Sequence, residues 1–243
     1  MMNISRIACA LVLCSLTYAQ SFEVASIYPH KGPNVNHFDR LPGNHEIRTS
    51  SSLWSLVAVA YYTRQIFIAD KKASWITNDW WDLDAKAEQR FTEPELMIML
   101  QNLLADRFKL QVEKEQKPGT IYTLTVDTGG LKLLKSKDEA AYPTDRVIPD
   151  RPGSEDTGFV RSATAISMSQ FAFGFPFQNL RAPVVDATGL LDRYDIHFVL
   201  ASLSEEPAAI IEACKKQLGL RLEPGQGQIQ TITVLHAEKP SEN

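Results

Sequence analysis

The sequence predicts an α+β fold built from two duplicated small modules, each with two helices packed on a small mixed β-sheet. Three observations lead to this prediction. The hexapeptide IYTLTV at 121–126 returns as IQTITV at 229–234, with four of six residues identical. Segments with strand and helix periodicity come in a similar order before both copies. A stretch rich in proline, glycine and charge at 135–157 lies between them and predicts a linker.

The chain therefore divides into four parts. We expect a signal peptide at 1–19, a first α+β module with an N-terminal strand at 20–134, the linker at 135–157 and a second module at 158–243. The signal peptide is indicated by Arg6, an apolar run from Ile7 to Leu16 and small residues before a cleavage point after Ala19. Because that run is too short to span a bilayer, it predicts export rather than anchoring, although an uncleaved anchor is the alternative.

The first module is expected to alternate strands and helices. A proline- and glycine-rich loop at 28–44 follows the first strand. A helix should begin after Ser52, and a second helix after Thr92, where Glu95 completes a capping box. The predicted strands lie at 21–27, 45–50, 66–69, 80–87 and 108–112. A Lys-Pro-Gly turn at 117–119 is then expected to lead into IYTLTV.

The second module is expected to repeat this order. A strand starts after Gly158, a weak helix covers about 167–180 with an interruption near Pro176, and two strands flank a turn at Thr188-Gly189. A helix that starts at about Ser204 should end at Gly219, where a left-handed backbone is needed. Separate strands at 220–223 and 229–234 complete the module.

The two halves can be aligned at several points. Gly43 pairs with Gly158 and Ser52 with Ser167. The strand residues 81–83 match 194–196, and 108–113 match 218–223. These matches fall in the same order along the chain, which favours duplication over a coincidence of similar strand patterns.

Composition excludes several classes of function. The chain has 243 residues, of which 44% are hydrophobic and 22% charged, and a net charge of −4. Lys and Arg are scattered rather than gathered in a basic stripe, so no nucleic-acid partner is expected. No apolar run beyond the signal peptide approaches membrane length, so no transmembrane segment is expected after cleavage.

Cysteine usage allows no disulfide in the mature chain. Removal of the signal peptide takes away Cys9 and Cys14 and leaves Cys214 alone. Cys214 falls on the apolar stripe of a predicted helix, so we expect it to be buried and inert.

No catalytic, cofactor-binding or metal-binding residue is predicted. The five histidines have no metal-ligand spacing, and the sequence lacks a nucleophile elbow and a phosphate-binding loop. Asp186, Arg193 and Asp195 lie close in sequence and would suit an acid–base group. A turn that starts at Asp186, with Gly189 supplying backbone freedom and Arg193 paired to a carboxylate, is the favoured interpretation.

Three tryptophans, Trp75, Trp80 and Trp81, form the one unusual concentration of aromatic residues. Strand alternation should bury one of Trp80 and Trp81 and turn the other outward. An exposed tryptophan beside Tyr61 and Tyr62 would suit a sugar- or peptide-binding surface. A packed end of the first core is the alternative, and it is favoured because tryptophan is mostly buried.

The sequence resembles a soil-associated family of secreted bacterial proteins of unknown function, which occur in many paralogous copies in soil bacteria. The resemblance covers nearly the whole mature chain. It rests on FEVASI at 22–27, LLADRFKLQVE at 103–113, PVVDATGLLDRYD at 183–195, QLGLRLE at 217–223 and EKPSEN at 238–243. The family has no established activity, so the resemblance implies no catalytic residue. Each half is also loosely similar to the short N-terminal domain of secretins and TonB-dependent receptors, which implies an interaction module of the cell envelope.

Three functions are therefore considered for an exported protein that is periplasmic or extracellular. The first is a non-enzymatic module that binds an envelope protein or peptide, the second a binder of cell-wall glycan or another small ligand, and the third a hydrolase with an unrecognised site. We expect the first, through an unpaired strand edge around 123–126 or 231–234, with Thr231 and Thr233 on the binding surface together with the tryptophans.

Overall fold

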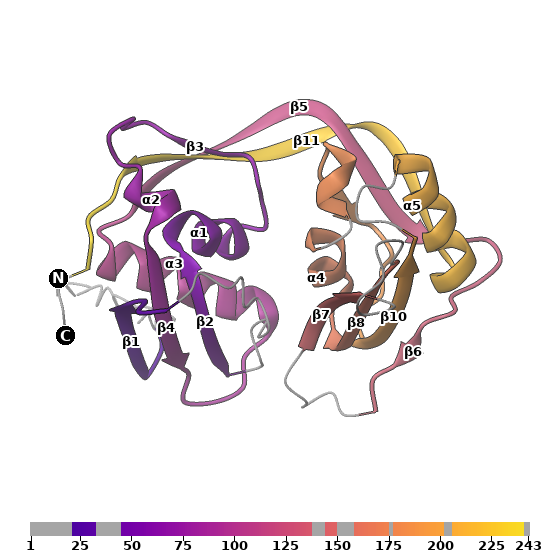
Figure 1. The fold of residues 1–243 in the computed structure, drawn as a ribbon, viewed down its shortest axis with the longest axis horizontal. Helices are drawn as coiled ribbons and strands as arrows, with labels where there is room; N and C mark the ends of the chain where they lie inside the picture. Colours follow the sequence, from indigo (N-terminus) through magenta and orange to yellow (C-terminus); the bar gives the residue numbers. More distant parts are fainter. Residues whose placement is uncertain are drawn as a thin grey trace, which may run out of the picture.

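The computed structural model has two lobes that lie side by side and are joined by a ribbon of two long strands (Figure 1). It describes residues 21–32, 45–137, 144–149, 158–174, 177–201 and 206–240. The expected signal peptide at 1–19 lies outside these residues. The α+β class is confirmed, since helices and small sheets occur in both lobes. No helix in the described ranges is long and apolar enough to cross a membrane.

The first lobe packs helices on a three-stranded antiparallel sheet with the order β1-β4-β2. Its strands are β1 (Val24–Pro29), β2 (Glu46–Ser52) and β4 (Trp80–Lys86), and its helices are α1 (Leu53–Ala60), α2 (Trp75–Asn78) and α3 (Glu93–Arg107). The predicted strand and helix starts are close to these bounds. The Ser52 hydroxyl accepts from the Ser55 amide at 3.3 Å and caps α1 as expected.

Helix α3 forms where local chemistry predicts it. The Thr92 backbone N–H donates to Glu95 Oε2 at 2.8 Å, which is the reciprocal arm of the capping box. Leu96, Leu100 and Leu104 recur at helical spacing, and each is at most 1% exposed. This apolar stripe packs into the first core.

The second lobe is built on a four-stranded antiparallel sheet with the order β6-β10-β8-β7. The strands are β6 (Leu134–Lys135), β7 (Thr144–Pro149), β8 (Phe159–Ile166) and β10 (Tyr194–Leu200), and the helices are α4 (Met168–Phe173), the 3₁₀ turn η1 (Phe177–Leu180), α5 (Pro207–Ala213) and the π-helical turn η2 (Cys214–Leu218). Strand β7 and part of β6 come from the stretch predicted as linker. Strand β7 lies at the sheet edge and ends at Pro149, where a missing N–H is tolerated.

The ribbon consists of β5 (Gln111–Val126) and β11 (Leu220–His236), which pair antiparallel along their whole length. Two short strands extend it in parallel, β3 (Ile66–Ile68) beside β11 and β9 (Val184–Asp186) beside β5. The predicted turn at 117–119 and the predicted break after residue 223 are therefore wrong. Pro118 and Pro224 continue the strands because, in the described residues, each lies where its strand has a partner on one side only.

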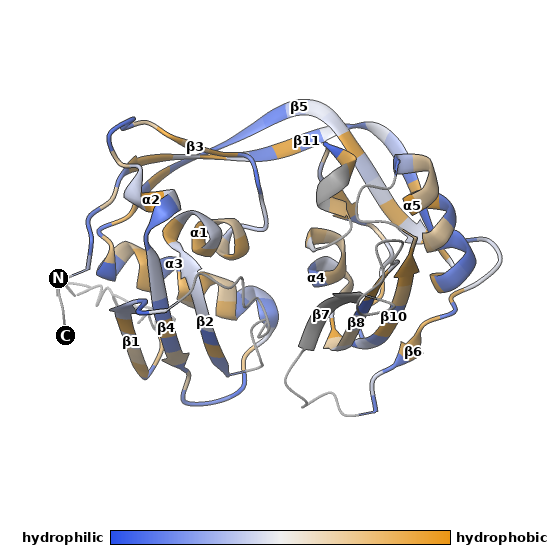
Figure 2. Ribbon diagram, in the orientation of Figure 1, coloured by the Kyte–Doolittle hydropathy of each residue, from blue (hydrophilic) through white to orange (hydrophobic). Residues whose placement is uncertain are grey.

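The ribbon carries each half of the chain into the core of the other lobe. Leu124 of IYTLTV is fully buried in the second core, whereas Ile232 and Val234 of IQTITV are buried in the first. The polar middle of the ribbon lies between the lobes (Figure 2). Duplication of a module stays a prediction, but the two hexapeptides do occupy opposite ends of one antiparallel ladder.

Two glycines face each other at the centre of this ladder, Gly119 and Gly227. A Cβ at Gly119 would lie 2.5 Å from Ile229 Cδ1, and a Cβ at Gly227 would lie 2.4 Å from Ile121 Cδ1. The first isoleucine of each hexapeptide thus packs over the glycine of the partner strand. Glycine is required there for close approach.

Candidate functional site

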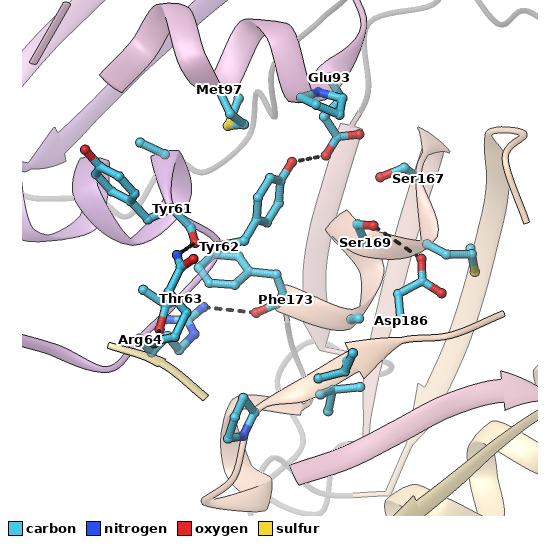
Figure 3. Close-up of a pocket in the computed structure, with 18 of the residues that line it drawn as sticks. Tyr61, Tyr62, Thr63, Arg64, Glu93, Met97, Ser167, Ser169, Phe173 and Asp186 are labelled. Atoms are coloured by element: carbon cyan, nitrogen blue, oxygen red, sulfur yellow. Dashed lines mark hydrogen bonds between the residues drawn. The ribbon is translucent and has the colours of Figure 1, made fainter. Parts of the chain in front are cut away.

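A cleft of about 1350 Å³ lies between the lobes, and both of them line it (Figure 3). The first lobe contributes the end of α1, the link to β3 and the first turns of α3, while the second contributes α4 and the segment from η1 through β9. Lys114 and Gln230 of the ribbon also face it. The lobes and the ribbon thus build one site together.

The walls of the cleft are largely apolar. Eight large apolar side chains are exposed in the described residues, and three of them, Ile98, Val185 and Leu191, line this cleft. Their exposed fractions are 44%, 40% and 98%. Apolar surface gathered in a concave site marks a place where something binds.

A hydroxyl–carboxyl cluster connects the lobes inside the cleft. The Tyr62 hydroxyl, at the end of α1, donates to Glu93 in the first turn of α3 (Figure 3). The hydroxyl of Ser167, the N-cap of α4 in the other lobe, is close enough to Glu93 to lower the pKa of that carboxyl. Burial raises the pKa of Glu93 above its usual range, while these two hydroxyls and the charge of Arg193 act in the opposite direction. Burial and the neighbouring carboxyl also raise the pKa of Tyr62.

A second contact across the cleft is aromatic. The Arg64 guanidinium lies 4.6 Å from the centre of the Phe173 ring, and Tyr62 meets the same ring edge-on at 5.8 Å. Arg64 Nη2 also lies 3.4 Å from the Phe173 carbonyl oxygen, at the long end of hydrogen-bond range. The lobes therefore touch through Tyr62, Arg64 and Phe173.

Backbone strain is found beside the cleft. Four residues other than glycine have a positive φ in the described chain, and two of them, Tyr62 at 47° and Arg181 at 57°, line the cleft. A third, Ala165, accepts a hydrogen bond from Arg193 Nη1 at 2.8 Å through its carbonyl. Left-handed backbone at such residues costs energy and is found preferentially at functional sites.

The predicted turn at Asp186 is present. Asp186 Oδ1 accepts from the Thr188 N–H at 3.0 Å and from the Thr188 hydroxyl at 2.7 Å, and Gly189 has a φ of 69°. Ser169 of α4 donates to the other carboxylate oxygen at 3.2 Å. Asp186 and Arg193 line the cleft but Asp195 does not, because Asp195 accepts from the Ala165 N–H at 3.0 Å.

The three predicted tryptophans lie outside the cleft. Trp81 is 4% exposed and meets Phe108 edge-on at 5.4 Å. Trp75 stacks on the same ring at 6.4 Å with 14° between the planes, and half-buried Trp80 lies near His30. Strand alternation therefore buries Trp81, as predicted for one of the two neighbours, and leaves Trp80 half-buried. Trp75 and Trp81 form the packed end of the first core, which is the favoured alternative.

The predicted strand edges at 123–126 and 231–234 are covered on both sides at 123–124 and at 232–234, so the binding prediction is wrong for these residues. Residues 232–234 pair with β3 on one side and β5 on the other, and residues 122–124 lie between β9 and β11. Thr231 is 3% exposed, and Thr233 pairs with both Phe67 and Glu113. Sequence patterns identify strands but do not show which edges their neighbours cover.

A histidine, an aspartate and a serine also meet in the first lobe, but not in a catalytic arrangement. His30 Nδ1 lies 2.8 Å from Asp82 Oδ1, and the Ser50 hydroxyl donates to the same oxygen. A nucleophilic serine must bond to the histidine rather than to the acid, so this cluster lacks the geometry of a triad. Within the described residues, no group of three His, Cys, Asp or Glu side chains is placed to hold a metal ion.

Sequence patterns do not identify Glu93 or Phe173 as site residues, and they name Tyr61 and Tyr62, which both line the cleft, only as neighbours of a possible tryptophan surface. The one signal was Glu93, an acidic residue in the first turn of a capped helix, which has a sufficient structural explanation there.

Comparison with curated proteins and with solved structures found no match. A family model matches residues 54–237, a range that includes α3, the ribbon and the whole cleft. The chain therefore belongs to the family described as "Protein of unknown function (DUF3738)".

Proposed function

We propose that this chain is an exported binding protein that holds its ligand in the cleft between the two lobes. One observation carries the proposal: both lobes contribute to a single large cleft whose apolar walls surround a small polar cluster. Ligand sites commonly combine apolar walls with a few polar groups that fix orientation. The three exposed apolar side chains in the cleft support this assignment, since a bound ligand would cover them.

Export and an envelope role form part of the same proposal. They are supported by the signal-peptide pattern at 1–19 and by the resemblance to secreted proteins of soil bacteria. Of the three functions considered from the sequence, ligand binding is favoured over partner binding at a strand edge, because β3 and β9 cover most of the edges expected to bind.

Thermal unfolding in the presence of a small-molecule library tests the proposal. A ligand present at a hundred times its Kd stabilises the folded state by about 2.7 kcal/mol. Ile98→Trp fills the cleft from α3 and should abolish the rise in melting temperature that the ligand causes. Val24→Trp places the same bulk at an exposed apolar residue of β1, outside the cleft, and should leave it intact. Loss of binding in both variants, or in neither, would refute the assignment of the cleft.

A hydrolase is the second candidate, and the Tyr62–Glu93 cluster favours it. A half-buried carboxyl in a cleft, with its pKa raised by burial, is a candidate general acid. Turnover of ester, amide or glycoside substrates by the native protein, lost in Glu93→Gln and retained in Glu113→Gln on the ribbon, would support this candidate. Binding to the cleft without turnover of any such substrate would remove it.

A further inference from the structure

The cleft is lined by more basic than acidic side chains. The whole chain is acidic, with a net charge of −4. Five basic but only three acidic side chains line the cleft: Arg64, Arg90, Lys114, Arg181 and Arg193 against Glu93, Glu95 and Asp186. The cleft thus gathers positive charge in an acidic protein, which favours an anionic ligand.

The three acids are already used by the fold. Each accepts hydrogen bonds from hydroxyl or amide groups of the protein, and these bonds hold the carboxyl groups in place without cancelling their charge, so the cleft keeps an excess of two basic side chains. The donors are Tyr62 for Glu93, Thr92 for Glu95, and Ser169 and Thr188 for Asp186.

The basic side chains of the cleft make different contacts from the acidic ones. Arg64 and Lys114 each lie 4.6 Å from an aromatic ring centre, on Phe173 and Tyr61 respectively. Aromatic stacking positions a cation without cancelling its charge. Arg90 and Arg181 are exposed, and neither forms an ion pair with a carboxylate in the part of the chain that the structure describes.

The uncancelled charge lies beside apolar surface. Arg181 is followed within four residues by Pro183, Val184 and Val185, all of which line the cleft. Ile98 of the first lobe adds to this surface and is 44% exposed. A ligand with a purely polar body would leave these side chains uncovered, and a purely apolar ligand would leave the cations without a counter-charge.

We infer that the ligand is a small amphiphile with an apolar acyl or aromatic body and one anionic head group, of which a carboxylate is the simplest. This inference rests on the proposed function. The head group pairs with Arg181 and Arg64, and the body covers Ile98 and Val185. Arginine suits the first role because its guanidinium matches a carboxylate in a bidentate geometry.

Calorimetric titration of the full chain with two probes of equal chain length tests the inference. The probes are dodecanoate and dodecyltrimethylammonium, both kept below their critical micelle concentrations. We expect dodecanoate to bind at least about tenfold more tightly, which is the scale of one charge-assisted hydrogen bond. Its affinity should fall as salt is raised, since screening weakens partly exposed charge pairs.

Matched variants locate the head group and the body. Arg181→Gln and Arg64→Gln should each weaken dodecanoate binding about tenfold, and neither should weaken dodecyltrimethylammonium binding, because they remove a like charge. Arg221→Gln removes an exposed arginine outside the cleft, where it is paired with Glu223 at 3.3 Å, and should change neither affinity. Ile98→Trp should weaken both probes. A melting curve for each variant separates loss of binding from loss of folding.

The outcomes separate the inference from the proposed function. If both probes bind equally and only Ile98→Trp weakens them, the cleft binds ligands but the anionic head group is wrong. If dodecanoate binds the wild type, Ile98→Trp and both arginine variants equally, its binding is adventitious and the inference fails. If no probe binds and no library compound shifts the melting temperature, the proposed function itself fails.

Discussion

Leu124→Ala tests whether the ribbon really exchanges strands between the lobes. Leu124 belongs to the first predicted module, at 20–134, yet its side chain is 0% exposed in the core of the second lobe, together with Cys214. A buried Leu→Ala change removes apolar contacts and leaves a cavity, at a cost of about 2–5 kcal/mol. Even 2 kcal/mol would raise the population of an opened second core about 30-fold.

Alkylation of Cys214 measures that opening. The thiol is 0% exposed and burial raises its pKa to about 12, so it reacts when the core opens. We expect Leu124→Ala to increase the native-state labelling rate about 30-fold, read from the mass of the peptide that contains Cys214. Leu100→Ala is the matched control, because Leu100 is 1% exposed in the first core. If Leu100→Ala exposes Cys214 and Leu124→Ala does not, the strand exchange is refuted.

The remaining predictions concern pH, backbone conformation, the ribbon and export. Glu93 has a folded pKa above its ordinary 4.5, so wild type should lose stability as pH rises from that value through the folded pKa; Glu93→Gln should lack this loss in melting temperatures between pH 4 and 8. Gly219→Ala should cost more than about 1 kcal/mol in urea unfolding, because φ is 65° and the new Cβ would lie 2.1 Å from a backbone oxygen, whereas Gly225→Ala in open space should cost less than about 0.5 kcal/mol. Thr231→Pro should lower stability by about 3 kcal/mol in the same assay, since Thr231 is buried within the ladder; a fully stable variant would contradict the pairing of β11. N-terminal sequencing of the exported protein should begin at Gln20 or within two residues of it, and Met1 in the exported form would contradict signal cleavage.

Local features of the fold could be predicted from the sequence because their causes lie within a few residues. The capping box at Thr92 joins two side chains three residues apart, and the left-handed Gly219 ends its helix through its own backbone. The turn at Asp186 likewise depends on Thr188, two residues away. In each case the chemistry that stabilises the feature is contained in the pattern itself.

The path of the ribbon could not be predicted in this way. Alternation around IYTLTV indicates a strand with one buried face but does not show which core receives Leu124. Pro118 and Gly119 resemble a turn, and only the missing neighbour on one side of the strand lets the chain remain extended there. The partner of this strand begins about a hundred residues later, at Leu220.

The candidate site could not be predicted from the sequence for the same reason. Tyr62 follows one helix, Glu93 begins another, and Ser167 caps a third in the opposite lobe. Each has an ordinary structural role in its own segment. Their joint role exists only where the ribbon holds the lobes face to face (Figure 1).

Because the ribbon exchanges strands between the lobes, it also has a consequence for fragments of this chain. A polypeptide cut between residues 137 and 158 would give a first fragment that keeps the strand of Leu124 and a second that keeps the strand of Ile232 and Val234. Each fragment would then carry the apolar strand that completes the other one, and would lack the strand that completes itself. The two pieces should therefore assemble with each other rather than act as two independent domains. A gene split at this point should behave as a complementation system, in which each half completes its core by assembling with the other.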